Sequence, residues 1–243
     1  MRETAQRDNP LGNRIVAGLP PDERERLVRG LRPVTFALGD VVYESGGRLE
    51  HVYFPTTAVV SLLFTMEDGS TAEMGMAGRE GVVGVALFLG GDTTPNRAVV
   101  QVAGGAYRTD ARVVREEFAR GGPLQHALLL YTQALITQIS QTAVCNRRHS
   151  TEKRLCRWLL MCHDRAQADE IQMTQEFIAN MLGGRRESVT AAARNLQDAG
   201  LIRYSRGHIS ILDRPGLEAA VCECHGIVSA EFERLLGLRA SDS

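Results

Sequence analysis

The spacing of apolar residues predicts a pair of short helices in the C-terminal half of the chain. Thr174 is a suitable N-cap for the first helix, and Gly183-Gly184 allows a tight reversal after it. The apolar face of the first helix consists of Phe177, Ile178, Met181 and Leu182. In the second helix, apolar residues fall at i, i+3, i+4 and i+7 and form a narrow stripe, namely Val189, Ala192, Ala193 and Leu196.

The outward face of the second helix is polar, and it carries Arg186, Glu187, Thr190 and Arg194. Arginine and an acceptor-bearing side chain on the first turns of such a helix can read base edges in a major groove. The pattern is therefore that of a helix-turn-helix that binds DNA. A helical hairpin whose polar face meets only water would give the same pattern.

The segment after the helix pair separates these two interpretations. Residues 201–204 and 208–212 form two β-branched runs around Ser205-Arg206-Gly207, which is a hairpin turn signal. A helix pair followed by a small basic hairpin is a winged helix, with Arg206 at the wing tip beside phosphates. We predict that DNA is contacted by Thr174, Gln175, Arg185, Arg186, Glu187, Ser188, Thr190, Arg194 and Arg206.

The N-terminal half has a different texture. Between residues 34 and 109, short β-branched runs are separated by glycine-bearing turns, and Glu67-Asp68-Gly69 is a strong turn signal. The candidate strands are 41–43, 52–54, 58–64, 72–76 and 99–103. Many short, closely spaced strands predict a barrel or sandwich. A short helix begins at Pro20 before them.

Residues 123–147 read as one long helix. Its apolar residues approximate a coiled-coil repeat, which predicts pairing with the same helix of a second subunit. Packing against the chain's own β domain is the alternative. We predict a dimer interface formed by Leu124, Leu128, Tyr131, Leu135 and Ile139. A further helix follows the cap Ser150, and a last helix that starts after Asp213 includes Leu217, Val221 and Cys224.

Composition sets few limits on this picture. The 243 residues are 44% hydrophobic and 23% charged, with a net charge of −1, as in ordinary globular proteins. Lys and Arg outnumber Asp and Glu between residues 146 and 214, which fits a DNA-binding part. No apolar run is long enough to span a membrane, and residues 1–8 lack the apolar core of a signal peptide, so we expect a cytoplasmic protein.

The five cysteines all lie in the second half of the chain, and we expect buried thiols. Cys222-Glu223-Cys224-His225 is the one local cluster of metal-ligand types. Its Cys-x-Cys gap is shorter than in zinc knuckles, and a continuous helix would turn the two thiols apart, so we predict no metal and no cofactor. A redox-responsive regulator that uses Cys222 or Cys224 is one alternative. A cupin-like enzyme with an appended DNA-binding module is another, but His51 is the only histidine between residues 30 and 120.

The order of a glycine-rich β domain, a long helix and a winged helix resembles the Crp/Fnr superfamily of bacterial transcription regulators. Residues 81–89 with 96–100 resemble its phosphate-binding cassette, and 174–196 resemble its DNA-reading motif. The resemblance implies an α+β fold. It predicts a cyclic-nucleotide-binding-type β-roll in residues 1–122, a dimerisation helix in 123–148, and a winged helix-turn-helix with a C-terminal helix in 149–243. Such a protein is no enzyme: it would bind double-stranded promoter DNA as a homodimer and contact RNA polymerase.

The resemblance also assigns roles to single residues. Arg186 and Glu187 match the pair that the family uses on G and C bases, and Thr174 and Gln175 match its phosphate anchors. Ala191 stands where the family often has a further arginine, so the operator sequence is open.

The predicted effector pocket comprises Gly84, Val85, Arg97 and Ala98. Val85 replaces the glutamate that accepts from the ribose hydroxyl in nucleotide-binding members, and Ala98 replaces a hydroxyl residue beside the arginine that pairs with the cyclic phosphate. This disfavours cyclic AMP and leaves an unidentified small-molecule effector, or none. No cysteine precedes Cys145 to hold the iron–sulfur cluster of oxygen-sensing relatives, and only His51 in the β domain could ligate a haem.

Overall fold

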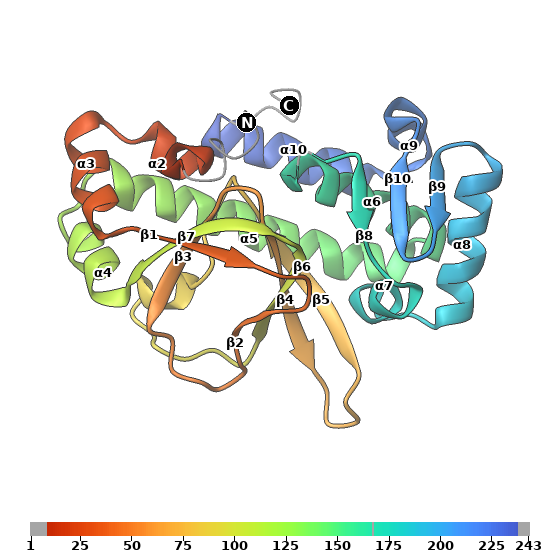
Figure 1. The fold of residues 1–243 in the computed structure, drawn as a ribbon, viewed down its shortest axis with the longest axis horizontal. Helices are drawn as coiled ribbons and strands as arrows, with labels where there is room; N and C mark the ends of the chain where they lie inside the picture. The colour runs from red at the N-terminus through yellow and green to blue at the C-terminus, as the bar shows by residue number, and fades with distance from the viewer. Residues whose placement is uncertain (1–8, 167, 238–243) are drawn as a thin grey trace. The chain divides into compact units, whose positions relative to one another are not determined.

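The structure is a computed structural model that describes residues 9–166 and 168–237 (Figure 1). Residues 1–8, for which we predicted no signal peptide, lie outside this part. The chain divides into two compact units. Unit 1 comprises Met1–Leu62 and Met76–Leu135, and unit 2 comprises Leu63–Gly75 and Ile136–Ser243. The division falls inside one helix that we predicted as a separate segment, so the three-part domain scheme remains a prediction.

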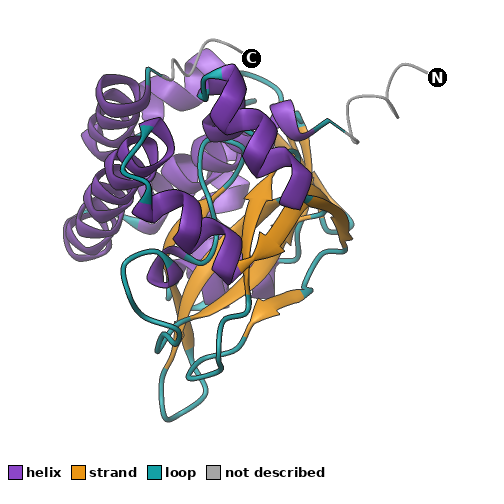
Figure 2. Ribbon diagram, turned by 90° about the vertical axis from the view of Figure 1, so that its left-hand side faces the viewer, coloured by secondary structure: helices purple, strands orange, loops and turns teal. Residues whose placement is uncertain are grey.

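Unit 1 holds a β-roll and the helices around it. Its helical elements are η1 (Pro10–Gly12), α2 (Arg14–Gly18), α3 (Pro21–Gly30), η2 (Val85–Leu87), α4 (Ala111–Ala119) and the first half of α5 (Pro123–Arg148). Its strands are β1 (Arg32–Phe36), β2 (Val41–Tyr43), β3 (His51–Pro55), β6 (Arg97–Val102) and β7 (Gly104–Asp110), with parts of β4 (Val59–Thr65) and β5 (Thr71–Ala77). The predicted β texture is confirmed. Strands are drawn in orange in Figure 2.

Two sheets make up this body, with strand orders β1-β7-β3 and β2-β6-β4-β5. Val52 and Phe54 on β3 are fully buried in the core and lie opposite Thr109 and Tyr107 of β7. β1 and β7 were not predicted from the sequence, because β1 is exposed or half-buried with few apolar residues, while β7 opens on two glycines. Pro33 in β1 fits the edge position of that strand.

The predicted long helix is present as α5, but its apolar stripe does not face solvent. Leu124, Leu128, Tyr131 and Leu135 are all buried in the chain itself. The Tyr131 hydroxyl donates to the Val82 carbonyl at 3.1 Å, and a Cβ on Gly81 would lie 2.1 Å from the Tyr131 ring. Only glycine permits this close approach. These contacts correspond to the alternative considered for this stripe, packing against the chain's own β domain.

Unit 2 holds the rest of α5, the tip of the β4–β5 hairpin and the C-terminal elements. The helices are α6 (Thr151–Ala166), α7 (Gln175–Leu182), α8 (Arg186–Asp198), α9 (Arg214–Ala220) and α10 (Glu223–Leu236). The strands β8 (Glu170–Gln172), β9 (Ile202–Ser205) and β10 (His208–Ile211) form a sheet of order β8-β10-β9. β8 was missed, since it offers one apolar residue, Ile171, which pairs with Ile209.

The predicted last helix is in fact two helices. Asp213 caps α9 as expected, and its side chain accepts from the Gly216 amide. Val221 and Cys222 are then extended, with ψ of 161° and 163°, so the chain changes direction before α10. Cys222 therefore precedes the helix, whereas Cys224 lies in its first turn. None of the helices in the described part of the chain has the length and apolar character of a membrane span.

Candidate nucleic-acid interface

The helix pair α7–α8 has a tight turn at the predicted glycines. The Thr174 hydroxyl accepts from the Phe177 amide at 3.1 Å and so caps α7. Gly183 ends α7 in the left-handed conformation with φ of 56°, which satisfies the last carbonyls of the helix. The chain then enters α8 at Arg185.

The two faces of α8 are clearly distinct. Val189, Ala192, Ala193 and Leu196 are buried, as predicted. The proposed DNA-contacting side chains on and around α8 are exposed: Arg185, Arg186, Glu187, Ser188, Thr190 and Arg194. Arg185, Arg186 and Arg206 form no ion pair within the described part of the chain, while Arg194 makes a long, exposed contact of 3.8 Å with Asp198. The guanidinium groups of the first three are thus available to a ligand.

Side chains join the two helices and the wing. The Thr190 hydroxyl donates to Gln175 Oε1 at 2.8 Å, which fixes the side chain of the first residue of α7. The Tyr204 amide on β9 donates to Gln197 Oε1 at 2.8 Å, and the Tyr204 hydroxyl donates to the Met173 carbonyl at 3.3 Å. Burial raises the pKa of Tyr204.

The wing is a two-residue hairpin. His208 pairs with Ser205, so only Arg206 and Gly207 form the turn, with φ of 51° and 80°. Arg206 is the one non-glycine residue with positive φ in the described residues. Positive φ at both central residues is the geometry of a type I′ turn, which favours Asn-Gly. Arginine at the first of these two positions therefore has a strained backbone.

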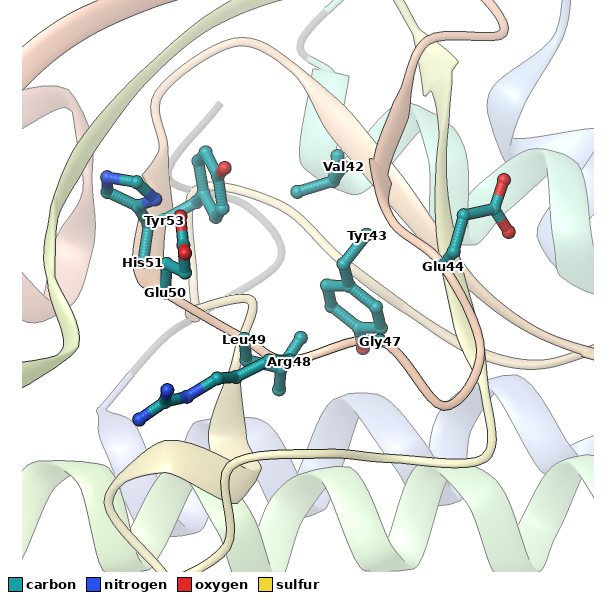
Figure 3. Close-up of a pocket in the computed structure, with 9 residues that line it drawn as sticks. All are labelled: Val42, Tyr43, Glu44, Gly47, Arg48, Leu49, Glu50, His51 and Tyr53. Carbon is teal, nitrogen blue, oxygen red and sulfur yellow. The ribbon is translucent and has the colours of Figure 1, made fainter.

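The predicted effector residues differ in exposure: Gly84 and Ala98 are buried, whereas Val85 and Arg97 are half-buried. Gly84 has φ of 106°, Val85 begins η2 and Ala98 is fully buried. The Arg97 guanidinium lies 3.1 Å from a carboxylate oxygen of Glu44. The family resemblance would pair this guanidinium with a phosphate, but here Glu44 is its partner. A pocket of about 190 Å³ lies nearby on the β2–β3 segment, and none of the four predicted residues lines it; its lining consists of Val42, Tyr43, Glu44, Gly47, Arg48, Leu49, Glu50, His51 and Tyr53 (Figure 3).

The comparisons with known proteins agree with this geometry. Residues 153–220 match the family described as the Crp-like helix-turn-helix domain. The chain carries a Crp-like helix-turn-helix domain. This domain runs from α6 to the end of α9 and contains the helix pair, the wing and the exposed arginines. A search of curated proteins found no match.

Solved structures extend the likeness to most of the chain. FixK2 from Bradyrhizobium japonicum has a TM-score of 0.67 and 17% identity, covering 79% of this chain and 98% of its own. The c-di-GMP-responsive regulator CLP from Xanthomonas campestris has a TM-score of 0.65 and 15% identity, covering 80% and 100%. A CRP-family transcriptional regulator from Thermus thermophilus has a TM-score of 0.63 and 18% identity, covering 86% and 100%. The chain thus shares the fold of Crp/Fnr regulators: a cyclic-nucleotide-binding-type β-roll, a long helix and a C-terminal helix-turn-helix.

Proposed function

We propose that the protein is a sequence-specific transcription regulator that binds promoter DNA as a homodimer and is not an enzyme. The observation that carries this proposal is the start of α8. There, Arg186 and Glu187 are both exposed in the first turn of the helix, ahead of its buried stripe. A guanidinium suits the guanine O6 and N7 atoms, and a carboxylate accepts from cytosine N4. A protein that acts on promoter DNA and contacts RNA polymerase works in the cytoplasm.

Contacts to phosphates would place α8 in the groove. The amide group of Gln175 is oriented by the bond from Thr190, and its nitrogen can donate to a phosphate. Arg206 at the wing tip supplies positive charge beyond the helix pair. A left-handed arginine at a hairpin tip costs free energy, and phosphate contact gives a reason to keep it.

The exposed face of α5 supports the homodimer. Leu129 and Ile136 are 45% and 58% exposed, although Leu128 beside them is fully buried. Both residues belong to a row of exposed residues that are four and three positions apart in turn. The row consists of Leu129, Gln133, Ile136, Ser140, Ala143 and Arg147. This spacing is that of a coiled-coil seam, so we propose that the row pairs with its copy in a second chain. The interface moves from the predicted stripe to the opposite side of the helix, and half-buried Ile139 borders it.

The effector, an unidentified small molecule or none at all, is not proposed to be cyclic AMP. The Arg97–Glu44 pair and the buried Ala98 leave a cyclic phosphate without its two partners. His51, which we considered for haem, lies 3.4 Å from Asp110 and serves as a local pairing residue.

Selection of bound duplexes from a random DNA library tests this function. Wild-type protein should enrich two half-sites about one helical turn, roughly 34 Å, apart. Arg186→Ala should enrich a motif with one relaxed base pair in each half-site. A library that shows no enrichment with folded wild-type protein would overturn the proposal.

A further inference from the structure

Three cysteines and one histidine of unit 2 converge on one point. They are Cys145, His149, Cys222 and Cys224, whose sulfur and imidazole nitrogen atoms all lie within 4.8 Å of one another. The three thiols are buried, and His149 is half-buried. None of the four belongs to the matched segment 153–220, but they flank it on both sides. The cluster therefore brings together the two ends of the Crp-like helix-turn-helix domain.

The local backbone places the four side chains in two pairs, Cys145 with His149 and Cys222 with Cys224. The His149 amide donates to the Cys145 carbonyl at 3.0 Å, so these residues are one helical turn apart at the end of α5. The extended Val221 and Cys222 separate α9 from α10. Because Cys222 stands outside the helix, its thiol is not turned away from that of Cys224. The sequence-based expectation that a helix would part these thiols is wrong.

The separations fit a tetrahedral ion. Cys145 Sγ and Cys222 Sγ are 3.7 Å apart, and Cys224 Sγ and His149 Nδ1 are 3.5 Å apart. A tetrahedral zinc with Zn–S of about 2.3 Å and Zn–N of about 2.0–2.1 Å has S···S and S···N edges of about 3.8 and about 3.6 Å. These two separations match the edges, and the remaining ones are no longer than 4.8 Å, so small side-chain shifts bring all four atoms around a single ion. The thiolates that bind different irons of an iron–sulfur cluster lie further apart.

The surroundings of the cluster are those of a ligand set. His149 Nε2 lies 3.4 Å from a carboxylate oxygen of Glu223, an arrangement that leaves Nδ1 for a metal. The Gln141 side-chain amide donates to Cys224 Sγ at 3.3 Å. Carboxylate–imidazole pairs and donors to sulfur are the usual supports of zinc ligands. Glu223 is exposed, so an ion can enter from the surface on this side.

A neighbouring cation balances the charge of such a site. Three thiolates around Zn²⁺ leave one negative charge in excess. Arg157 is buried, and among the described residues its guanidinium bonds to two neutral groups, Met161 Sδ at 3.2 Å and Thr142 Oγ1 at 3.3 Å. Burial raises the pKa of the Cys145 thiol, and the positive charge of Arg157 opposes that rise. A buried arginine with neutral partners is costly unless a nearby anion compensates it.

We propose that Cys145, His149, Cys222 and Cys224 bind one structural Zn²⁺ ion. On binding, three S–H bonds break, three Zn–S bonds and one Zn–N bond form, and three protons pass to the buffer. No electron is transferred. The ion closes the chain between the end of α5 and the start of α10, so that α6, the helix pair and the wing lie within one clamped loop. Closing so long a loop stabilises the folded state of the DNA-binding part.

Metal analysis of the tag-free protein, purified without chelators, provides the first test. We expect about one zinc per chain in the wild type and in Cys162→Ala, which removes a buried thiol outside the cluster. Cys145→Ala and Cys224→Ala should lose the zinc. Cobalt(II) added to the reduced apoprotein should give the intense visible bands of a tetrahedral thiolate site, and added zinc should bleach them.

A milder variant covers the case in which the cysteine variants do not fold. Glu223→Gln changes an exposed side chain and should retain the fold, yet weaken zinc binding about 10- to 100-fold. Two results would overturn the proposal. One is folded wild-type protein without zinc that gives no tetrahedral cobalt spectrum. The other is a native mass lower by two hydrogens with Cys145 linked to Cys222, which would make the cluster a redox-active thiol pair instead.

Discussion

The Thr190 hydroxyl on α8 donates a hydrogen bond to the side-chain carbonyl of Gln175, the first residue of α7, at 2.8 Å. This bond crosses the turn of the helix pair and links a residue of the proposed base-reading helix to one of the proposed phosphate anchors. Because an amide has its donor and acceptor on opposite arms, fixing the carbonyl also directs the NH₂ group. Thr190 thus serves as a positioning residue in the proposed interface.

Replacing Thr190 with valine should weaken DNA binding more than it weakens the fold. The substitution preserves shape and removes the exposed hydroxyl, which has two acceptors within reach, Gln175 Oε1 at 2.8 Å and the Arg186 carbonyl at 2.9 Å. Its one proton is worth about 0.5–1.5 kcal/mol as a hydrogen bond. Thr190→Ser retains the hydroxyl and is the matched control. Denaturant unfolding and fluorescence anisotropy on the selected operator measure the two effects. Equal losses of affinity in both variants would show that the hydroxyl has no positioning role.

The exposed row on α5 predicts how the dimer can be broken. Leu129→Glu with Ile136→Glu should give folded monomers, because both side chains are already in water in the single chain. Leu128→Glu should unfold the protein instead, since it places a charge at a fully buried position. Leu212→Glu, at an exposed leucine outside α5, is the control and should remain dimeric. Sedimentation measures the mass; a double variant that stays dimeric would exclude the row.

Cyclic AMP should bind weakly or not at all. Arg97 would have to leave Glu44, and Val85 and Ala98 offer no polar group to the ribose or phosphate. Each buried polar ligand group without a partner costs about 1–3 kcal/mol. Titration calorimetry on the wild type and on Glu44→Gln, which frees Arg97, measures this. Low-micromolar binding by the wild type would contradict the prediction.

The sequence predicted the elements whose signals are local. The cap Thr174, the glycine turn, the stripe on α8 and the hairpin around Arg206 each depend on a few neighbouring residues, and the structure confirms them. For the N-terminal half, the sequence predicted many short strands in a barrel or sandwich. It did not predict β1 and β7, because these strands pair across a long stretch of chain, as between Pro33 and Tyr107. The predicted DNA contacts and effector residues remain predictions.

The errors concern which face of a helix is covered and where a helix breaks. Coiled-coil spacing occurs on two sides of α5, a buried side that packs on Gly81 and an exposed side. Periodicity alone does not distinguish the buried side from the exposed one. The break at Cys222 has no proline or glycine to signal it. The Cys145-x₃-His149 spacing, however, was visible in the sequence and pairs naturally with Cys222-x-Cys224.

An ion network on α6, α9 and α10 predicts acid sensitivity of unit 2. Asp164 accepts from Arg214 at 2.6 Å and contacts His225 Nε2 at 3.1 Å. Burial alone would raise the pKa of Asp164, but the hydrogen bond with His225 and the charge of Arg214 outweigh it and hold the pKa below its usual 3.8. A carboxyl with a depressed folded-state pKa contributes stability above its unfolded pKa and loses it as the pH falls through the folded one.

Asp164→Asn should therefore cost about 1–3 kcal/mol of unfolding free energy at neutral pH. The difference from the wild type should shrink below about pH 4, where the wild-type carboxyl begins to take up its proton. Asp198→Asn, at an exposed carboxyl with one long contact, is the control and should change little. Urea unfolding from neutral to acid pH measures the effect. A difference that does not depend on pH would contradict the assigned role of the Asp164 charge.

Arg186 and Arg206 should differ in the kind of binding free energy that they supply. Arg186 in the first turn of α8 is proposed to contact a guanine, so Arg186→Ala should cost about 1–3 kcal/mol per half-site and relax preference at one base pair. Arg206 is proposed to contact a phosphate. Arg206→Asn removes the charge but suits the left-handed backbone of the turn, so the wing should remain intact.

Binding to the selected operator and to a scrambled duplex, measured across several salt concentrations, separates the two roles. Arg206→Asn should weaken both complexes by a similar factor and make the dependence on salt shallower, because one phosphate contact and its released counterion are lost. Arg186→Ala should weaken mainly the operator complex, since a scrambled duplex offers no matched guanine to lose. A guanidinium that attracted DNA only through its charge would affect both duplexes alike. If Arg186→Ala lowers the two affinities by the same factor, Arg186 contacts the backbone, and base reading must come from other residues of α8.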